Sequence, residues 1–134
     1  MKRFFVLAVA VVLVLFGLTI TPAPAYAFDE ASLTQLFKTN KCKDCDLTGA
    51  DLTAASLTGA DLERANLTGA NLTGANLSGA DLEKVNLGLA NLTEANLSGA
   101  DLEKANLTGA DLTRTNLKGA SLEKATMPDG SKHG

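Results

Sequence analysis

Hydrophobic and polar positions repeat every five residues from Cys45 onward, without a gap. Most units read Ala, then Asn or Asp, then Leu, then two variable residues; leucine holds the centre of every unit from Leu47 to Leu122, and Met127 the next. A period of five fits neither an amphipathic helix nor a long alternating strand. Because residues two apart in an extended segment face the same side, the pattern predicts short extended legs with Ala and Leu facing inward. The legs are joined by bends at the variable positions, where glycine is frequent.

The variable positions indicate how many legs make one coil. Glu followed by Lys or Arg at these two positions recurs every 20 residues, as Glu63-Arg64, Glu83-Lys84, Glu103-Lys104 and Glu123-Lys124. A coil of four legs places such pairs directly above one another. The sequence therefore predicts a four-sided tube with a leucine interior.

The run ADLTAASLTGADLERANLTGANLTGANLSGADLEK resembles the pentapeptide-repeat proteins and their A-(D/N)-L-x-x consensus. The resemblance covers residues 45–129 and implies an all-β fold, a right-handed quadrilateral parallel β-helix, here of a little over four coils. A short capping α-helix is expected at its N-terminal end. The leader, the Cys pair and the ending TMPDGSKHG look like those of exported or thylakoid-lumenal cyanobacterial members.

Residues 1–27 have the three parts of a secretory signal peptide. Lys2 and Arg3 precede the apolar run Phe4 to Ile20, and the small residues of Ala25-Tyr26-Ala27 follow two prolines. The alternative is an uncleaved membrane anchor, although this run is at the short limit for spanning a bilayer. We expect cleavage after Ala27, no membrane attachment afterwards, and residence in a periplasm or thylakoid lumen, with the extracellular space less favoured.

The two ends of the tube need covering, because stacked coils leave unpaired backbone there. Residues 28–44 are expected to form a cap helix and a Cys loop, with the helix over residues 29–39. Either Asp29 or Ser32 can cap this helix, the latter at capping-box spacing from Gln35. Its apolar face is expected to cover the first coil through Leu33, Leu36 and Phe37. Residues 130–134 are expected to be a flexible tail.

Cys42 and Cys45 are the only cysteines. In an exported protein an even number of cysteines favours a structural disulfide. The alternatives are a redox-active C-x-x-C site, which needs a helix N-terminus beneath it, and a zinc site, which needs two further ligands when only His133 is available.

One face of the predicted tube gathers most of the charge. We define the charged face by Asp61, Glu63, Arg64, Asp81, Glu83, Lys84, Asp101, Glu103, Lys104, Glu123 and Lys124. It is either a solvated ladder of neighbouring opposite charges or a docking surface for a protein; a cation site among the aspartates is disfavoured, because the basic residues compete for them. On the next face, Leu89 stands where Gly, Lys or Arg usually points outward and is a second candidate contact.

Composition and shape exclude several functions. The chain of 134 residues has 12 basic and 15 acidic residues, 4% aromatics and no Trp, which argues against nucleic-acid binding. A convex rod filled with leucine offers no concave site, so we expect no enzyme activity, cofactor or metal. The leading hypothesis is an exported rigid surface for protein–protein interaction with an unknown partner, as a monomer or a weak end-to-end dimer. The alternative is a structural or stress-related solenoid without a specific partner; ice binding through stacked threonines is disfavoured.

Overall fold

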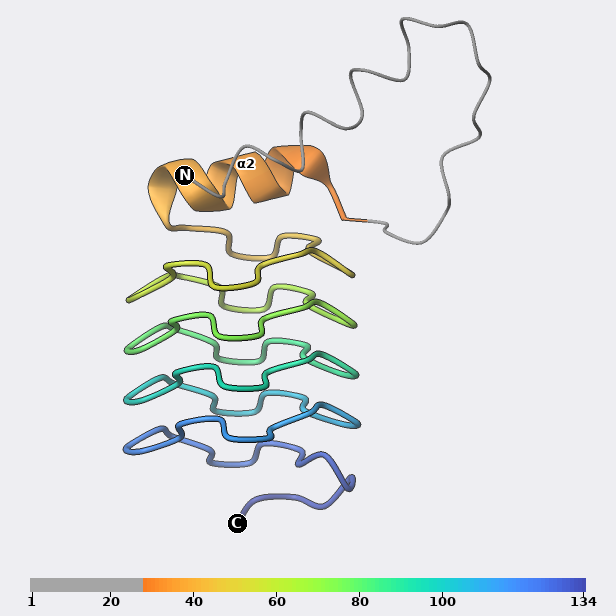
Figure 1. Ribbon diagram of the computed structural model, residues 1–134. Helices are drawn as coiled ribbons and strands as arrows, with labels where there is room; N and C mark the ends of the chain where they lie inside the picture. Colours follow the sequence, from red (N-terminus) through yellow and green to blue (C-terminus); the bar gives the residue numbers. More distant parts are fainter. Residues whose placement is uncertain (1–27) are drawn as a thin grey trace, which may run out of the picture.

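The computed structural model describes residues 28–134 and shows a stack of coils with one helix at its N-terminal end (Figure 1). The predicted signal peptide, residues 1–27, lies outside the described residues. The helix, α2, spans Glu30–Thr39. No extended leg within residues 28–134 is long enough to count as a strand, because each leg turns after about three residues; the legs pair instead through isolated parallel bridges.

Each parallel bridge joins residues 20 apart, which is four repeat units. One column of bridges runs from Lys41 through Asp61, Asp81 and Asp101 to Ser121, and three similar columns begin at Asp46, Asp51 and Ser56. The amide of Leu62 donates to the carbonyl of Asp81 at 2.8 Å, and the amide of Asp81 donates back to the carbonyl of Ala60 at 2.9 Å. The four columns form the four sides that the spacing of the Glu–Lys/Arg pairs predicts.

The bend between legs is a tight turn at the variable positions. In one turn, the amide of Ala65 donates to the carbonyl of Leu62 at 3.0 Å, and Arg64 between them has a φ of 58°. A positive φ at the third residue is the mark of a type II turn and suits glycine, which often occupies this place. Charged residues such as Lys84 and Lys104 adopt the same conformation, with φ of 57° and 59°.

The interior is a column of leucines padded by alanines. Every central leucine from Leu47 to Leu107 is at most 1% exposed, because it is covered on both sides, by a coil or, at the N-terminal end, by α2. By contrast, Leu112, Leu117 and Leu122 in the final coil are only partly buried. The core is therefore covered at the helix end and partly exposed to solvent at the C-terminal end.

The polar residue between Ala and Leu has a structural role that the sequence analysis missed. The side-chain oxygen of Asn66 accepts hydrogen bonds from the amide of Thr68 at 3.1 Å and from its hydroxyl at 2.6 Å. The same bond to the amide two residues on is made by all 14 Asn and Asp residues at this position. Asn and Asp favour turns because their short side chains bond to the backbone in this way. The position thus initiates each bend as well as facing outward.

Helix α2 is capped by Asp29. Its carboxylate accepts from the amides of Ala31 and Ser32 at 3.3 and 3.1 Å and from the Ser32 hydroxyl at 2.8 Å. The alternative of Ser32 as the cap, with a Ser32–Gln35 capping box, is wrong, because Ser32 lies buried inside the helix and the Gln35 amide donates to the carbonyl of Lys41. Leu33 and Leu36 are buried against the first coil, as their spacing predicts.

The Asp29 cap predicts an acid-sensitive helix. The Ser32 hydroxyl and the Ala31 amide hold the pKa of Asp29 below its ordinary value. Since the folded-state pKa is lowered, this contribution to stability is complete above the unfolded pKa of about 4 and is lost as the pH falls through the folded pKa. We expect the helical circular-dichroism signal at 222 nm to weaken as the pH falls below about 4. Asp29→Asn keeps a capping oxygen without the titration, so an identical acid profile for this variant would contradict the assignment.

A disulfide joins Cys42 to Cys45 beneath the helix. Both cysteines are buried, and Cys45 fills an inward position usually held by alanine. The amide of Cys42 also donates to the carbonyl of Asp61 in the next coil at 2.7 Å. The disulfide therefore connects the segment that follows α2 to the start of the coil stack.

Residues 131–133, in the segment expected to be a flexible tail, fold back under the final coil. Lys132 forms an antiparallel bridge with Thr126. The amide of Met127 donates to Ser131, the amide of His133 donates to Ala125, and the carbonyl of His133 accepts from Lys124, at 2.8 to 3.0 Å. This segment covers one of the four sides of the C-terminal end.

Candidate interaction surface

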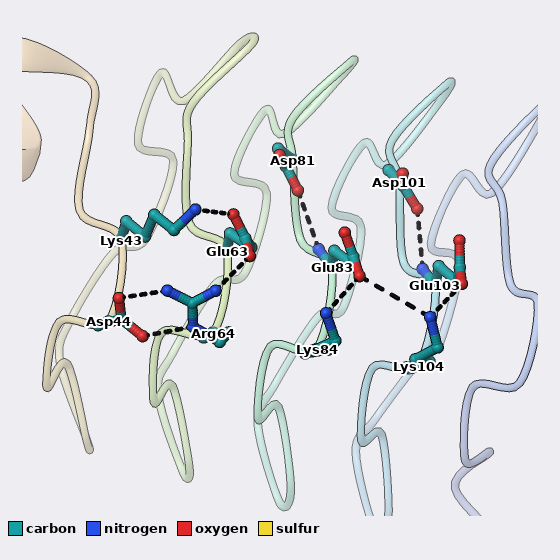
Figure 2. A network of polar contacts seen from close by, with 10 residues as sticks. All are labelled: Lys43, Asp44, Glu63, Arg64, Asp81, Glu83, Lys84, Asp101, Glu103 and Lys104. Carbon is teal, nitrogen blue, oxygen red and sulfur yellow. Dashed lines mark hydrogen bonds and ion pairs between the residues drawn. The ribbon is translucent and has the colours of Figure 1, made fainter.

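The 20-residue register brings the residues of the charged face together in three adjacent columns. Asp61, Asp81 and Asp101 stack through their bridges. A Glu column and a basic column run beside Asp81 and Asp101 (Figure 2). Successive coils lie about 4.8 Å apart, as neighbouring strands do. The face is therefore a rigid grid of charges whose spacing is set by the backbone.

The N-terminal part of the grid forms ion pairs with the loop that precedes the first full repeat. The Arg64 guanidinium donates from Nε and Nη2 to the two carboxylate oxygens of Asp44, both at 2.7 Å, and from Nη1 to Glu63. Lys43 pairs with the other oxygen of Glu63. The bond to Asp44 raises the pKa of Arg64, and the bond to Arg64 lowers the pKa of Asp44.

Lys43 and Asp44 are members of this network that the sequence analysis did not name. They stand 20 residues before Glu63 and Arg64, with the order of charges reversed. Extending the register one coil upstream would have found them. The inversion places opposite charges above one another, so the loop that carries the disulfide is also held by ion pairs.

In the C-terminal part of the grid, each Glu forms an ion pair with the Lys that follows it in the same coil. Glu83 accepts from Lys84 at 2.6 Å and lies 3.9 Å from Nζ of Lys104, which pairs with Glu103. Glu123 and Lys124 pair at 2.9 Å between Oε1 and Nζ. The bond from Lys84 lowers the pKa of Glu83, and the bond to Glu103 raises the pKa of Lys104. The Glu and basic columns largely neutralise each other.

The aspartate column has a different role. Its carboxylates accept from the amides of Glu63, Glu83 and Glu103 at 3.3, 3.1 and 2.9 Å. Within residues 28–134, none of the three aspartates has a basic group within 4.0 Å. The charged face therefore carries a strip of aspartate carboxylates whose charge is not paired.

Three carboxylates on this face lie close enough together to be considered as ligands of a cation. Ligand atoms of Asp61, Glu63 and Asp81 lie within 4.8 Å of one another in the described part of the chain. However, Lys43 and Arg64 already bind both oxygens of Glu63. The cluster is explained by the stacking of the columns, and we assign no metal to it.

The family profile for pentapeptide repeats matches this chain in eight copies, over residues 45–83 and 90–127. The chain is a pentapeptide-repeat protein. The gap in the match, residues 84–89, contains the irregular unit VNLGL. The right-handed quadrilateral β-helix of this family agrees with the four-sided coil described above.

Three solved pentapeptide-repeat structures are similar to this one. A protein from the thylakoid lumen of Arabidopsis thaliana has 30% identity, covering 69% of this chain and 65% of its own, with a TM-score of 0.45. A protein from Nostoc has 35% identity, with coverages of 73% and 78% and a TM-score of 0.42. HetL of Nostoc, involved in heterocyst differentiation regulation, has 33% identity, coverages of 69% and 66%, and a TM-score of 0.26. This chain thus spans less than two thirds of the Arabidopsis protein. No curated protein sequence matches it.

Leu89 is the second candidate contact in this pentapeptide-repeat protein. The residue is 71% exposed, and within residues 28–134 no other large hydrophobic residue is exposed. Its φ of 59° is in the left-handed region, and its side chain lies over Gly109 in the next coil. A Cβ at Gly109 would come within 2.7 Å of Leu89 Cδ2, so the glycine makes room for it. A single exposed leucine is common in soluble proteins, and its role as a contact stays a prediction.

The threonines on the remaining faces are occupied by the repeat itself. On the side whose bridges begin at Asp51, the hydroxyls of Thr53, Thr73 and Thr113 donate to the Asn or Asp two residues earlier at 2.6 Å. These bonds stabilise the bends and fix the hydroxyl hydrogens toward the protein. The hydrogen bonds within the repeat therefore explain the presence of these three threonines.

A shallow hollow of about 280 Å³ lies between the end of α2 and the first coil. It is lined by Leu36, Phe37, Lys38, Thr39, Asn40, Ser56 and Thr58. This lining contains no carboxylate, histidine or cysteine that could partner Lys38 in acid–base chemistry.

Within residues 28–134, no helix has the length and apolar character needed to cross a membrane.

Proposed function

We propose that this pentapeptide-repeat protein is exported and acts without catalysis, as a rigid scaffold whose charged face binds a basic protein partner. The observation that carries the proposal is the aspartate column, whose three carboxylates are not ion-paired within the described chain. Asp81 and Asp101 are exposed, and Asp61 is half-buried. The residues of the charged face comprise seven acidic and four basic side chains. The surplus of negative charge selects a partner with positive charge.

The scaffold supports binding by holding the carboxylates in place before a partner arrives. Each aspartate is fixed by the bond from the amide two residues on, and each of its coils is fixed by bridges to the coils on either side. A preorganised surface loses little conformational entropy on association. Export is supported by the features of residues 1–27, and the relative from a thylakoid lumen is compatible with a periplasmic or lumenal location.

The decisive variant is Asp61→Asn/Asp81→Asn/Asp101→Asn. Asparagine makes the same bond to the backbone at Asn66, Asn71 and other equivalent positions, so the fold is expected to be retained while three negative charges are lost. Residues 28–134 and this variant serve as baits for affinity capture from the native exported compartment, with quantitative mass spectrometry. We expect a stoichiometric, salt-sensitive partner to be retained by the unaltered bait and reduced at least about tenfold by the variant.

The matched control is Asp46→Asn/Asp51→Asn/Asp111→Asn. It makes the same chemical change and the same change in net charge on two other faces of the solenoid. Equal losses with both triple variants would mean that total charge, and not this face, governs binding. Retention of the partner by the first variant would refute docking through the aspartate column.

The alternative is a self-contained structural or stress-related solenoid. It is favoured by the internal pairing of the Glu and basic columns, which stabilises the coils without requiring a partner. If neither the unaltered bait nor the control retains any protein above background, this alternative becomes the better account.

A further inference from the structure

One edge of the first coil lacks backbone pairing, although α2 covers the core at this end (Figure 1). In later coils, the amide at each outward position donates to a carbonyl one coil earlier; that of Asn76 donates to Ala55 at 2.9 Å. The equivalent amide of Ser56 has no hydrogen-bond partner among residues 28–134, and neither has the Ser56 carbonyl. The leg that contains Ser56 thus presents a main-chain donor and a main-chain acceptor at the edge of the stack.

The helix does not pair with this edge, because its own amides and carbonyls bond within it. Pairing occurs where the chain after α2 is extended. The amide of Asp61 donates to the carbonyl of Asn40 at 3.0 Å, and the amide of Cys42 donates to the carbonyl of Asp61 at 2.7 Å; together they form the parallel bridge of Lys41 with Asp61. An extended segment beside Ser56 would make the same two bonds, one to its amide and one to its carbonyl.

The hollow of about 280 Å³ lies against this unpaired edge. Ser56, which is exposed, and Thr58 line it on the coil side, and the last turn of α2 lines it on the other. An incoming main chain therefore reaches Ser56 through open space. A sheet edge with free donors and acceptors is a template for another strand, and extended peptides bind proteins by adding to such an edge.

Lys38 is the one charged residue in the lining of the hollow. It is exposed, and within residues 28–134 it has no ion pair. A segment that carries an acidic side chain complements this charge.

We propose that the Ser56 edge and the hollow beside it form a docking site for an extended, acidic segment of a partner protein. The segment adds one leg to the first coil, parallel to the leg that contains Ser56, and places a carboxylate beside Lys38. Main-chain bonds supply affinity for an extended chain, and Lys38 selects acidic sequences. The site lies on a different side of the solenoid from the aspartate column, so it does not depend on the basic partner proposed for that column.

Amide hydrogen exchange, followed by nuclear magnetic resonance on residues 28–134, tests whether the edge is free. We expect the Ser56 amide to exchange at least about a hundredfold faster than the Asn76 amide, which holds the same position one coil later and is paired. Slow exchange at Ser56, or exchange that slows as the protein concentration rises, overturns the proposal, because the chain itself or a second copy then fills the edge.

A display library of short random peptides serves as the probe for docking. We expect acidic peptides to be enriched and to slow the exchange of the Ser56 amide when they bind. Ser56→Pro removes this amide without breaking a bond within residues 28–134, and it is expected to weaken the enriched peptides at least about tenfold. Ser56→Ala keeps the amide and is expected to bind them as the unaltered chain does.

A second pair of variants leaves the edge itself unchanged. Lys38→Glu is expected to weaken the same peptides at least about fivefold. Lys41→Glu makes the same change of charge at an exposed residue outside the lining and is expected to have a clearly smaller effect. This pair decides the matter if circular dichroism shows that Ser56→Pro fails to fold. The proposal is overturned if no peptide is enriched, if folded Ser56→Pro binds the peptides as tightly as the unaltered chain, or if the two Lys variants weaken binding equally.

Discussion

Leu82→Ala is expected to lower the free energy of unfolding by about 2–5 kcal/mol. Leu82 is completely buried and lies in the interior column between Leu62 and Leu102, one coil away on each side, which are also completely buried. Truncation would leave a cavity that the neighbouring coils cannot fill, because their backbones are fixed by bridges to one another. Urea denaturation followed by circular dichroism measures the loss.

The matched comparison is Leu117→Ala in the final coil. Its leucine holds the same central position of the repeat but is only partly buried. We expect a clearly smaller loss, because less apolar surface is removed from contact and the open end can relax. A loss below about 1 kcal/mol for Leu82→Ala, or equal losses for the two variants, would contradict the closed leucine column.

Replacing both cysteines, as Cys42→Ala/Cys45→Ala, is expected to cost about 2 kcal/mol of stability. The disulfide closes a short loop, with a sequence separation of 3, so the entropy gained by the unfolded chain is modest. Alanine is the usual residue at the position of Cys45, so packing there is largely preserved. The loss should be felt first at the N-terminal end, and the signal of α2 at 222 nm should melt at a lower urea concentration.

Reduction of the unaltered protein provides the control for this variant. A reducing agent should reproduce the shift in the native protein and have no effect on Cys42→Ala/Cys45→Ala. If the native protein and the double variant unfold at the same urea concentration, the disulfide does not stabilise the cap.

The fold could be predicted from the sequence because each level of the pattern constrains the next. Leu and Ala at fixed spacing define which side of each leg is buried, and the pairs from Glu63-Arg64 to Glu123-Lys124 define the number of legs in a coil. The bridges at 20-residue separation confirm this spacing. Leu36 and its neighbours could be assigned to the cap because an apolar face on a short helix beside a stack has one place to be buried.

Other features depend on contacts that the pattern of residue types does not specify. Asp29 and Ser32 are both good N-caps, and the choice follows from the burial of Ser32 against the core. The bend-forming bonds of the Asn and Asp positions require the turn geometry to be known. Lys43 and Asp44 lie in a loop before the first full repeat, so the repeat pattern does not assign them to the charged face. The fold-back of residues 131–133 likewise depends on unpaired amides that exist only once the final coil has formed.

The candidate site is less predictable than the fold for a physical reason. Inward positions are constrained by packing, whereas outward positions tolerate most polar residues and vary with little effect on stability. The sequence could therefore place the charged residues on one face, but it could not distinguish the paired Glu83 and Lys84 from the unpaired aspartate column. That distinction, which gives the face its negative surplus, comes from the side-chain contacts.

The 20-residue register has a consequence for how such a chain can change over time. Duplicating one whole coil would lengthen the rod and extend every column without altering the direction in which any side chain points. Duplicating a single repeat would preserve the leucine interior equally well, yet it would turn everything beyond it by a quarter of a revolution. The aspartate column would then be split between two sides of the rod. Changes in the length of this protein are thus neutral for folding in steps of five residues, but neutral for its surface only in steps of 20.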